Sequence, residues 1–214
     1  MRWRRSRPVV AVVAVVAVVA ALAGWRWWHN RPPYGPEALA LRSSLTFVTY
    51  QEAQAALGAQ VHAPAANDGD QLVLGRVSWQ APPKPLDGGW FAIFLIDKRN
   101  DRRPGVFGLS APRPQALSIG SHGAENRIPE RYPWLRGAGD VPVGDGTWRG
   151  SGNRVGVFDE AASPLTFVAR FPHLEAPDQE TLVATAPVAM SDLLLALAYL
   201  GPDGQVYWAQ RLSG

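Results

Sequence analysis

The chain has 214 residues, of which 18% are charged and 47% are apolar or aromatic, and it contains no cysteine. Disulfides, thiolate metal sites and a cysteine nucleophile are therefore excluded. The net charge of +3 arises at the N-terminus: from Trp27 onward there are 16 basic and 18 acidic residues and no Lys or Arg block, which argues against nucleic-acid binding. Arg greatly outnumbers Lys, and Ala, Gly and Pro are abundant; because these residues have GC-rich codons, we expect a bacterial protein.

Residues 8–28 predict a single transmembrane signal-anchor helix. Between Arg7 and Arg26 lie 18 uncharged residues, which as a helix measure about 27 Å against a hydrocarbon core of about 30 Å. A bilayer offers backbone N–H and C=O groups no other partner, so even a Val-rich segment must be helical there. Indole and guanidinium groups favour the headgroup layers. The residues expected in these layers are Arg4, Arg5, Arg7, Trp25, Arg26, Trp27 and Trp28.

The basic tail, residues 1–7, predicts the orientation of this anchor. By the positive-inside rule the N-terminus stays in the cytoplasm and the residues after the helix are extracytoplasmic. The alternative is a cleaved secretory signal, because Ala21-Leu22-Ala23 fits the small-x-small rule and the strictly apolar run over 9–23 has only 15 residues. Cleavage after Ala23 would make the protein secreted, but the tryptophans and Arg26 beyond that point favour an uncleaved anchor.

The next segments predict a linker and one short helix. Residues 29–36, HNRPPYGP, are expected to form a proline-rich linker, and the extracytoplasmic domain is expected over 37–214. Pro36 suits the first position of a helical turn, and the SLTFVTY segment after it alternates like a strand. A capping box of Thr49 and Glu52, with Gly58 as the end, predicts a short helix.

From residue 71 onward the sequence predicts strands. QLVLGRVSWQ and GWFAIFLID are rich in β-branched and aromatic residues, and the second is apolar on both faces, as in a central strand. NRVGVFD and PLTFVARF predict one hairpin across EAAS. DLLLALAYL and QVYWAQRL predict another, joined by GPDG in a type I turn followed by a bulge. The expected fold is mainly β, a β-sandwich for which an immunoglobulin-like form is one option.

Residues 111–152 interrupt this pattern. They contain eight Gly and five Pro, which indicates either a functional loop or short strands that the sequence does not reveal. Aromatic and polar side chains in such a segment suit contacts with a ligand or partner, although RYPWLRG could instead hold the segment in place by burying Trp134 and Leu135. The candidate contact residues are Tyr132, Trp134, Trp148, His122 and Asp145.

The sequence carries no catalytic motif of the GxSxG, SxxK, HExxH or GxxxxGK type, and its four histidines are dispersed. We expect no enzyme activity, metal or cofactor, but a binding or accessory module of a bacterial cell envelope. Its expected partners are the lipid bilayer, through residues 8–28, and another envelope or membrane protein rather than a glycan. Two alternatives stay open: an envelope hydrolase assembled from His122 with Ser121, Asp140 or Asp145, and a structural subunit of a membrane complex.

Overall fold

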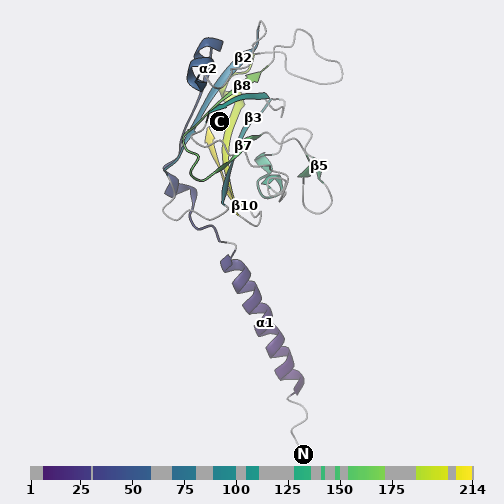
Figure 1. Ribbon diagram of the computed structural model, residues 1–214. Coiled ribbons are helices and arrows are strands. Elements are labelled where there is room, and N and C mark those ends of the chain that lie inside the picture. The colour runs from purple at the N-terminus through teal and green to yellow at the C-terminus, as the bar shows by residue number, and fades with distance from the viewer. Residues whose placement is uncertain are drawn as a thin grey trace, which may run out of the picture. The chain divides into compact units, whose positions relative to one another are not determined.

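The chain forms two compact units, Met1–Pro32 and Pro33–Gly214, which are described one at a time below (Figure 1). A computed structural model describes residues 7–29, 31–58, 69–80, 89–99, 105–110, 128–135, 141–142, 148–149, 154–171, 187–201 and 206–213.

The first unit contains one helix, α1 (Arg7–His29). Its 18-residue segment Ala11–Trp28 is long and apolar enough to cross a membrane, and none of this segment is buried. Val16 and Leu22, for example, expose about 60% of their surface. The helix therefore presents apolar side chains around its circumference, as the sequence predicted for this segment.

The second unit begins at Pro33, earlier than the expected start at Glu37. Tyr34 is buried in the core, and its carbonyl oxygen accepts a hydrogen bond of 3.1 Å from Trp208 Nε1. The end of the expected linker 29–36 thus belongs to the folded unit. The turn predicted at Pro36 is a 3-10 helix, η1 (Pro36–Leu39), which the Gln80 N–H to Leu39 O hydrogen bond of 2.7 Å ties to the rest of the unit.

The first antiparallel sheet has the strand order β1-β2-β8-β4. Its strands are β1 (Arg42–Val48), β2 (Gln71–Ser78), β8 (Leu165–Phe171) and β4 (Gly105–Ser110). Three of these match predicted strands. β4 was not predicted, because it is short, contains two glycines and follows a highly charged stretch.

The second antiparallel sheet has the strand order β10-β9-β3-β7. Its strands are β10 (Val206–Ser213), β9 (Leu193–Leu200), β3 (Trp90–Asp97) and β7 (Arg154–Asp159). β3 and β9 are the two inner strands, and both bury nearly all their side chains. The prediction that GWFAIFLID is a central strand covered on both faces is confirmed.

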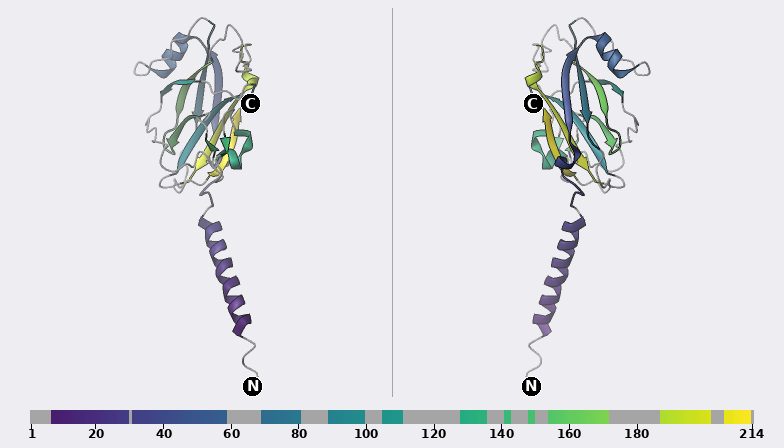
Figure 2. Two further views of the ribbon diagram at one scale, coloured as in Figure 1. Left: turned by 90° about the vertical axis from the view of Figure 1, so that its right-hand side faces the viewer. Right: turned by 90° about the vertical axis from the view of Figure 1, so that its left-hand side faces the viewer.

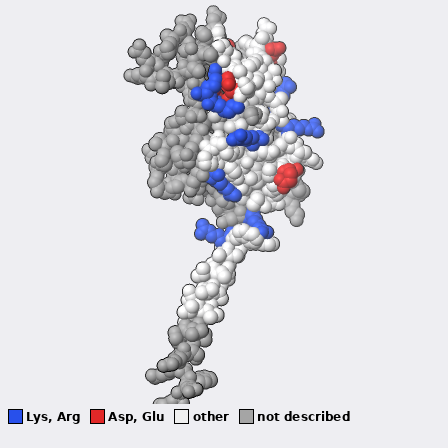
Figure 3. Space-filling model, turned by 180° about the vertical axis from the view of Figure 1, so that it is seen from behind, with Lys and Arg blue, Asp and Glu red and all other residues white. Residues whose placement is uncertain are grey.

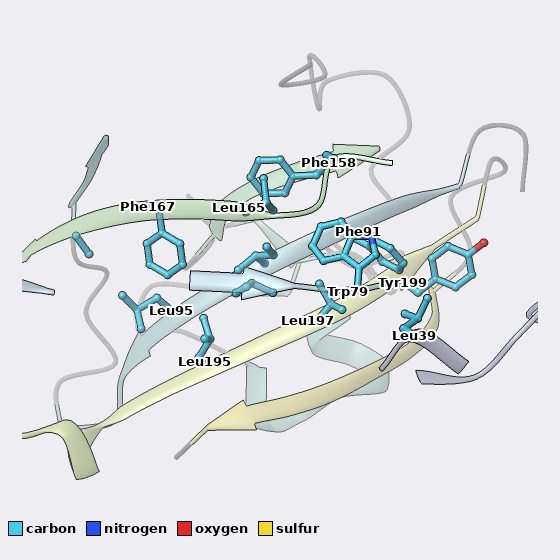
Figure 4. Packing of buried hydrophobic residues seen from close by; sticks show 14 of the residues in the cluster. Leu39, Trp79, Phe91, Leu95, Phe158, Leu165, Phe167, Leu195, Leu197 and Tyr199 are labelled. Carbon is cyan, nitrogen blue, oxygen red and sulfur yellow. The ribbon is translucent and has the colours of Figure 1, made fainter. Parts of the chain in front are cut away.

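Side chains from both sheets build one hydrophobic core (Figure 4). Alternate residues of β3, among them Phe91 and Leu95, meet Leu165 and Phe167 of β8 in this cluster. Gly75 of β2 leaves room for the Phe167 ring, since a Cβ at this position would lie 2.1 Å from the ring.

Short helices cover the outer faces of the two sheets, on opposite sides of the unit (Figure 2). On the first sheet, α2 (Tyr50–Leu57) buries Ala53 and Leu57 against apolar residues of β2 and β8. Thr49 Oγ1 accepts from the Glu52 N–H, and the Glu52 carboxylate accepts from the Thr49 N–H at 2.8 Å. The predicted capping box and the end of the helix at Gly58 are confirmed.

The predicted hairpin of NRVGVFD and PLTFVARF is wrong in its pairing, although both strands form. β7 pairs with β3 in one sheet and β8 pairs with β2 and β4 in the other, so the chain crosses between sheets. Trp79 holds this crossover: its N–H donates to Ser163 Oγ at 2.9 Å, and its Nε1 donates to Glu160 O at 2.7 Å. Ala162 is completely buried between them. The short connection between β7 and β8 is compatible with either a hairpin or a crossover between sheets. The long-range contacts of Trp79 select the crossover.

The second predicted hairpin is confirmed. β9 and β10 pair antiparallel, with Leu200 opposite Val206. The predicted GPDG turn spans residues 201–204, and residues 202–204 lie outside the described part of the chain. A further 3-10 helix, η5 (Met190–Asp192), precedes β9.

Within residues 111–152 the structure describes four short elements. They are α3 (Ile128–Arg131), η4 (Pro133–Leu135), β5 (Val141–Pro142) and β6 (Trp148–Arg149). The predicted loop region thus contains two helical turns and a small antiparallel ladder.

Candidate contact site on the second sheet

The candidate site is the α3–η4 segment on the outer face of the second sheet. Two backbone hydrogen bonds shape it, from the Tyr132 N–H to Ile128 O at 2.8 Å and from the Leu135 N–H to Tyr132 O at 2.9 Å. Together they place Ile128 and Leu135 on the side that faces the sheet, where both are fully buried. Burial of two such side chains stabilises the segment by about 1.5 to 3 kcal/mol each.

The sheet beneath the segment contributes three alanines among larger apolar residues such as Phe94 and Ile96. Ala92 of β3 lies opposite Ala198 of β9, and Phe94 lies opposite Ala196. These residues belong to the same buried cluster as Ile128 and Leu135. Because alanine projects only one methyl group, the sheet surface leaves space for the larger side chains of the segment.

The solvent side of the segment is an aromatic and cationic cluster, which we define as Arg131, Tyr132, Trp134 and Arg211. The rings of Tyr132 and Trp134 meet edge to face with centroids 6.1 Å apart. The Arg211 guanidinium, from β10, lies 4.9 Å from the Trp134 ring, and that of Arg131 lies 5.7 Å from the Tyr132 ring. Both distances suit cation–π attraction, which is worth about 0.5 to 1 kcal/mol at an exposed site.

The cluster is positively charged. Arg131 donates from Nη1 to the backbone oxygen of Val206, which fixes the guanidinium beside β10. Within the described ranges, no carboxylate pairs with Arg131 or Arg211. Tyr132 and Trp134 are half-buried, so each offers part of a ring to solvent. Such a surface can stack on a flat group and attract a carboxylate or phosphate at the same time.

The structure brings together only some of the residues that the sequence suggested for contacts. Tyr132 and Trp134 are neighbours in the cluster. Trp148 lies in β6, paired with Pro142, and the position of its side chain is not described. His122 and Asp145 lie outside the described residues, as do Arg4 and Arg5 of the predicted anchor.

Sequence reasoning missed the two arginines of the cluster. Arg131 is adjacent to Tyr132, and its place in RYPWLRG could have suggested a shared role. Arg211 reaches Trp134 only because β10 occupies the edge of the second sheet. No local pattern signals a contact between residues this far apart in the chain.

A second group of polar side chains is buried and closed to solvent. The Tyr199 hydroxyl donates to Glu160 Oε1 at 2.5 Å, and the Tyr34 ring stacks on that of Tyr199 with centroids 4.9 Å apart. Burial is the main cause that raises the pKa of both tyrosines above the usual range. Gly89 permits this packing, because a Cβ there would lie 2.2 Å from Glu160 Oε1. Since Glu160 and Tyr199 are almost inaccessible, the group links structural elements and is not a contact site.

No known protein family matches this chain, and no curated protein or solved structure is similar to it. The candidate site is therefore defined by its geometry. Among the described residues, no group of three or more His, Cys, Asp or Glu side chains could hold a metal ion.

Proposed function

We propose that this protein is a single-pass, membrane-anchored binding or accessory module of a bacterial cell envelope. In this proposal the two sheets form an extracytoplasmic β-sandwich. The aromatic and cationic cluster is its contact surface for another envelope or membrane protein.

The observation that carries the membrane assignment is the exposure of α1. The Val and Leu side chains over residues 12–22 have no protein partner within the described residues, and about 60% of each is accessible. Apolar surface of this extent is unfavourable in water, whereas each Val or Leu at the centre of a membrane helix favours insertion by about 0.3 to 0.6 kcal/mol. The flanking Trp25, Trp27 and Trp28 suit the headgroup layer.

The binding role is supported by the composition of the cluster. Trp, Tyr and Arg are the residues most enriched at the energetic centres of protein interfaces. A rigid sheet supports the α3–η4 segment from below, so binding would require little ordering of Tyr132 and Trp134. Arg131 and Arg211 pair with no carboxylate of the described ranges, and their charges favour a partner surface that carries carboxylates.

The contact role is tested by photo-crosslinking in cells. Pro133 is exposed within the segment, whereas Tyr50 is exposed on α2 over the other sheet. Each is replaced in a separate variant by p-benzoylphenylalanine. We expect a discrete crosslinked adduct from position 133 that disappears when Trp134→Ala is added, and no such adduct from position 50.

Equal adducts from both positions would show non-selective proximity and contradict the proposal. Failure of position 133 to crosslink in membranes that retain the protein would also contradict the binding role. In that case the structural-subunit alternative can be tested by gentle solubilisation of the membranes. Recovery of a complex held through α1 alone would favour that alternative.

A further inference from the structure

The outer face of the first sheet carries an open depression of about 390 Å³ beside the part that α2 covers. The polar side chains at its rim come from three strands: Arg42 and Ser44 from β1, Arg76 and Ser78 from β2, and Thr166 from β8. None of these residues belongs to the aromatic and cationic cluster, which lies on the other sheet.

Strand register places these five side chains next to one another. Ser44 is opposite Arg76, and Arg76 is opposite Thr166, so the three form one row across the sheet. Arg42 is opposite Ser78 in the adjacent row of the same face. Arg42 and Arg76 are therefore diagonal neighbours, a relationship that holds two residues about 7 to 8 Å apart and their Cβ atoms somewhat closer.

The two arginines have no partner among the residues that the structure describes. Arg42 and Arg76 are exposed, and neither forms an ion pair, a hydrogen bond or a cation–π contact with any described residue. By contrast, Arg99 pairs with Asp97 at 2.9 Å. In the view of Figure 3, several blue Lys and Arg side chains stand apart on a largely white surface, whereas a blue group near the top lies against red atoms. Two adjacent cations without a counter-ion in the described part of the chain form a site of positive potential.

We propose that this depression binds a phosphate group, as a free phosphate or as the phosphate of a lipid headgroup. Arg42 and Arg76 would each direct a guanidinium fork at the phosphate oxygens, a geometry that matches Arg especially well. The hydroxyls of Ser44, Ser78 and Thr166 make no hydrogen bond with described residues and can donate to the remaining oxygens. The volume lies within the range of small-ligand sites.

This inference goes beyond the proposed function and does not rest on it, because free phosphate can bind whether or not α1 is in a membrane. If α1 is in a membrane, a lipid source becomes accessible.

The test measures protection of individual arginines in the full-length protein. The protein is placed in phosphatidylcholine nanodiscs and treated with phenylglyoxal, which modifies arginine, and the rate at each site is read by peptide mass spectrometry. Inorganic phosphate is added in one arm, sodium chloride of equal ionic strength in a second, and phosphatidic acid is built into the discs in a third. Acetylated arginine added to every sample is the reference for the rate of modification, because Arg211 belongs to the other cationic cluster.

We expect phosphate or phosphatidic acid to slow modification of Arg42 and Arg76 at least threefold relative to the added acetylated arginine. Protection by inorganic phosphate identifies a free phosphate as sufficient, and protection by phosphatidic acid alone identifies a lipid headgroup. Protection in neither arm, or equal protection by chloride, overturns the proposal.

Variants test whether the two arginines act together. Arg76→Gln should reduce the protection of Arg42 to less than 1.5-fold, whereas Lys98→Gln, which removes an exposed cation elsewhere, should leave it unchanged. Undiminished protection of Arg42 in Arg76→Gln overturns the shared site. Because Arg76 is exposed, the variant should keep the wild-type circular dichroism spectrum. A protein that leaves the membrane fraction yet shows phosphate protection refutes the proposed anchor and not this site.

Discussion

The hydroxyl of Tyr199 donates a 2.5 Å hydrogen bond to Oε1 of Glu160 and thereby ties the inner strand β9 to the crossover between the two sheets. The indole of Trp79 binds the backbone oxygen of the same glutamate at 2.7 Å. This crossover is thus held by β9 of one sheet and by the residue that directly follows β2 of the other sheet.

Tyr199→Phe should destabilise the folded unit by about 1 to 3 kcal/mol. The substitution removes the hydroxyl and leaves the buried Glu160 carboxyl group with one hydrogen-bond partner fewer. Loss of a hydrogen bond to a buried polar group costs about 1 to 3 kcal/mol. The free energy of unfolding from urea titration measures the effect. The control is Tyr50→Phe, at an exposed tyrosine, which should change the free energy of unfolding by less than about 0.5 kcal/mol. An equal effect of the two variants would contradict the structural role of the hydrogen bond.

The same tyrosines predict a loss of stability in alkali. Burial raises the pKa of Tyr199 and Tyr34 in the folded state above the ordinary value of 10.0. The stability that this provides is fully present below pH 10 and is lost as the pH rises above it, because the unfolded chain then releases protons that the folded one keeps. In urea titrations from pH 8 to 11, Tyr199→Phe should lose less stability than the wild type. Parallel curves would refute this.

Gly75→Ala should destabilise the core by about 1 to 3 kcal/mol, because the new Cβ would overlap the Phe167 ring, which lies 2.1 Å from its position. The double variant Gly75→Ala/Phe167→Leu tests the cause. If overlap is responsible, the two changes together cost less than the sum of each alone. Additive unfolding free energies would show that the ring is not what excludes a side chain at residue 75.

Thr49→Ala should destabilise the protein by about 1 kcal/mol by removing the N-cap of α2. The stability that this cap provides should depend on pH, since hydrogen bonds from the Thr49 backbone and side chain lower the pKa of Glu52 below its ordinary value of 4.5. The stabilisation by ionised Glu52 is fully present above pH 4.5 and is lost as the pH falls through the lower pKa of the folded state. Glu52→Gln should therefore differ most from the wild type at neutral pH. A difference that grows on acidification would reverse the expected sign.

Trp134 and Arg211 should be coupled energetically across the edge of the second sheet. A double-mutant cycle of Trp134→Ala and Arg211→Ala is expected to give a coupling of about 0.5 to 1 kcal/mol in unfolding free energy. Arg42→Ala, which lies on the other sheet, should show no coupling with Trp134→Ala. A coupling of zero for the first pair would mean that the guanidinium does not bind the ring in solution.

Substitution within α1 tests the membrane assignment. Val16→Arg places a charge at the middle of the apolar segment and should weaken insertion by about 2.5 to 3.5 kcal/mol. Carbonate extraction of membranes should retain the wild type and release more of the variant.

The intact mass of the wild-type protein separates an anchor from a signal cut after Ala23. Recovery of the uncleaved wild type entirely in the soluble fraction would contradict the anchor.

The sequence alone determined those helices and strands that depend on interactions between residues close together in the chain. The capping box of Thr49 and Glu52, the apolar helix α1 and the two-faced apolar strand β3 each follow from residues within a few positions of one another. Their backbone hydrogen bonds, side-chain period and solvent preference act over that same short range.

Only the tertiary structure decided which strands pair and which side chains meet. β7 and β8 read as a hairpin, yet the contacts of Trp79 and the burial of Ala162 place them in different sheets. Likewise, Arg211 meets Trp134, and Arg42 lies diagonal to Arg76, through register and sheet order. Such contacts depend on how apolar faces from distant segments share one core, and no short stretch of sequence contains that information.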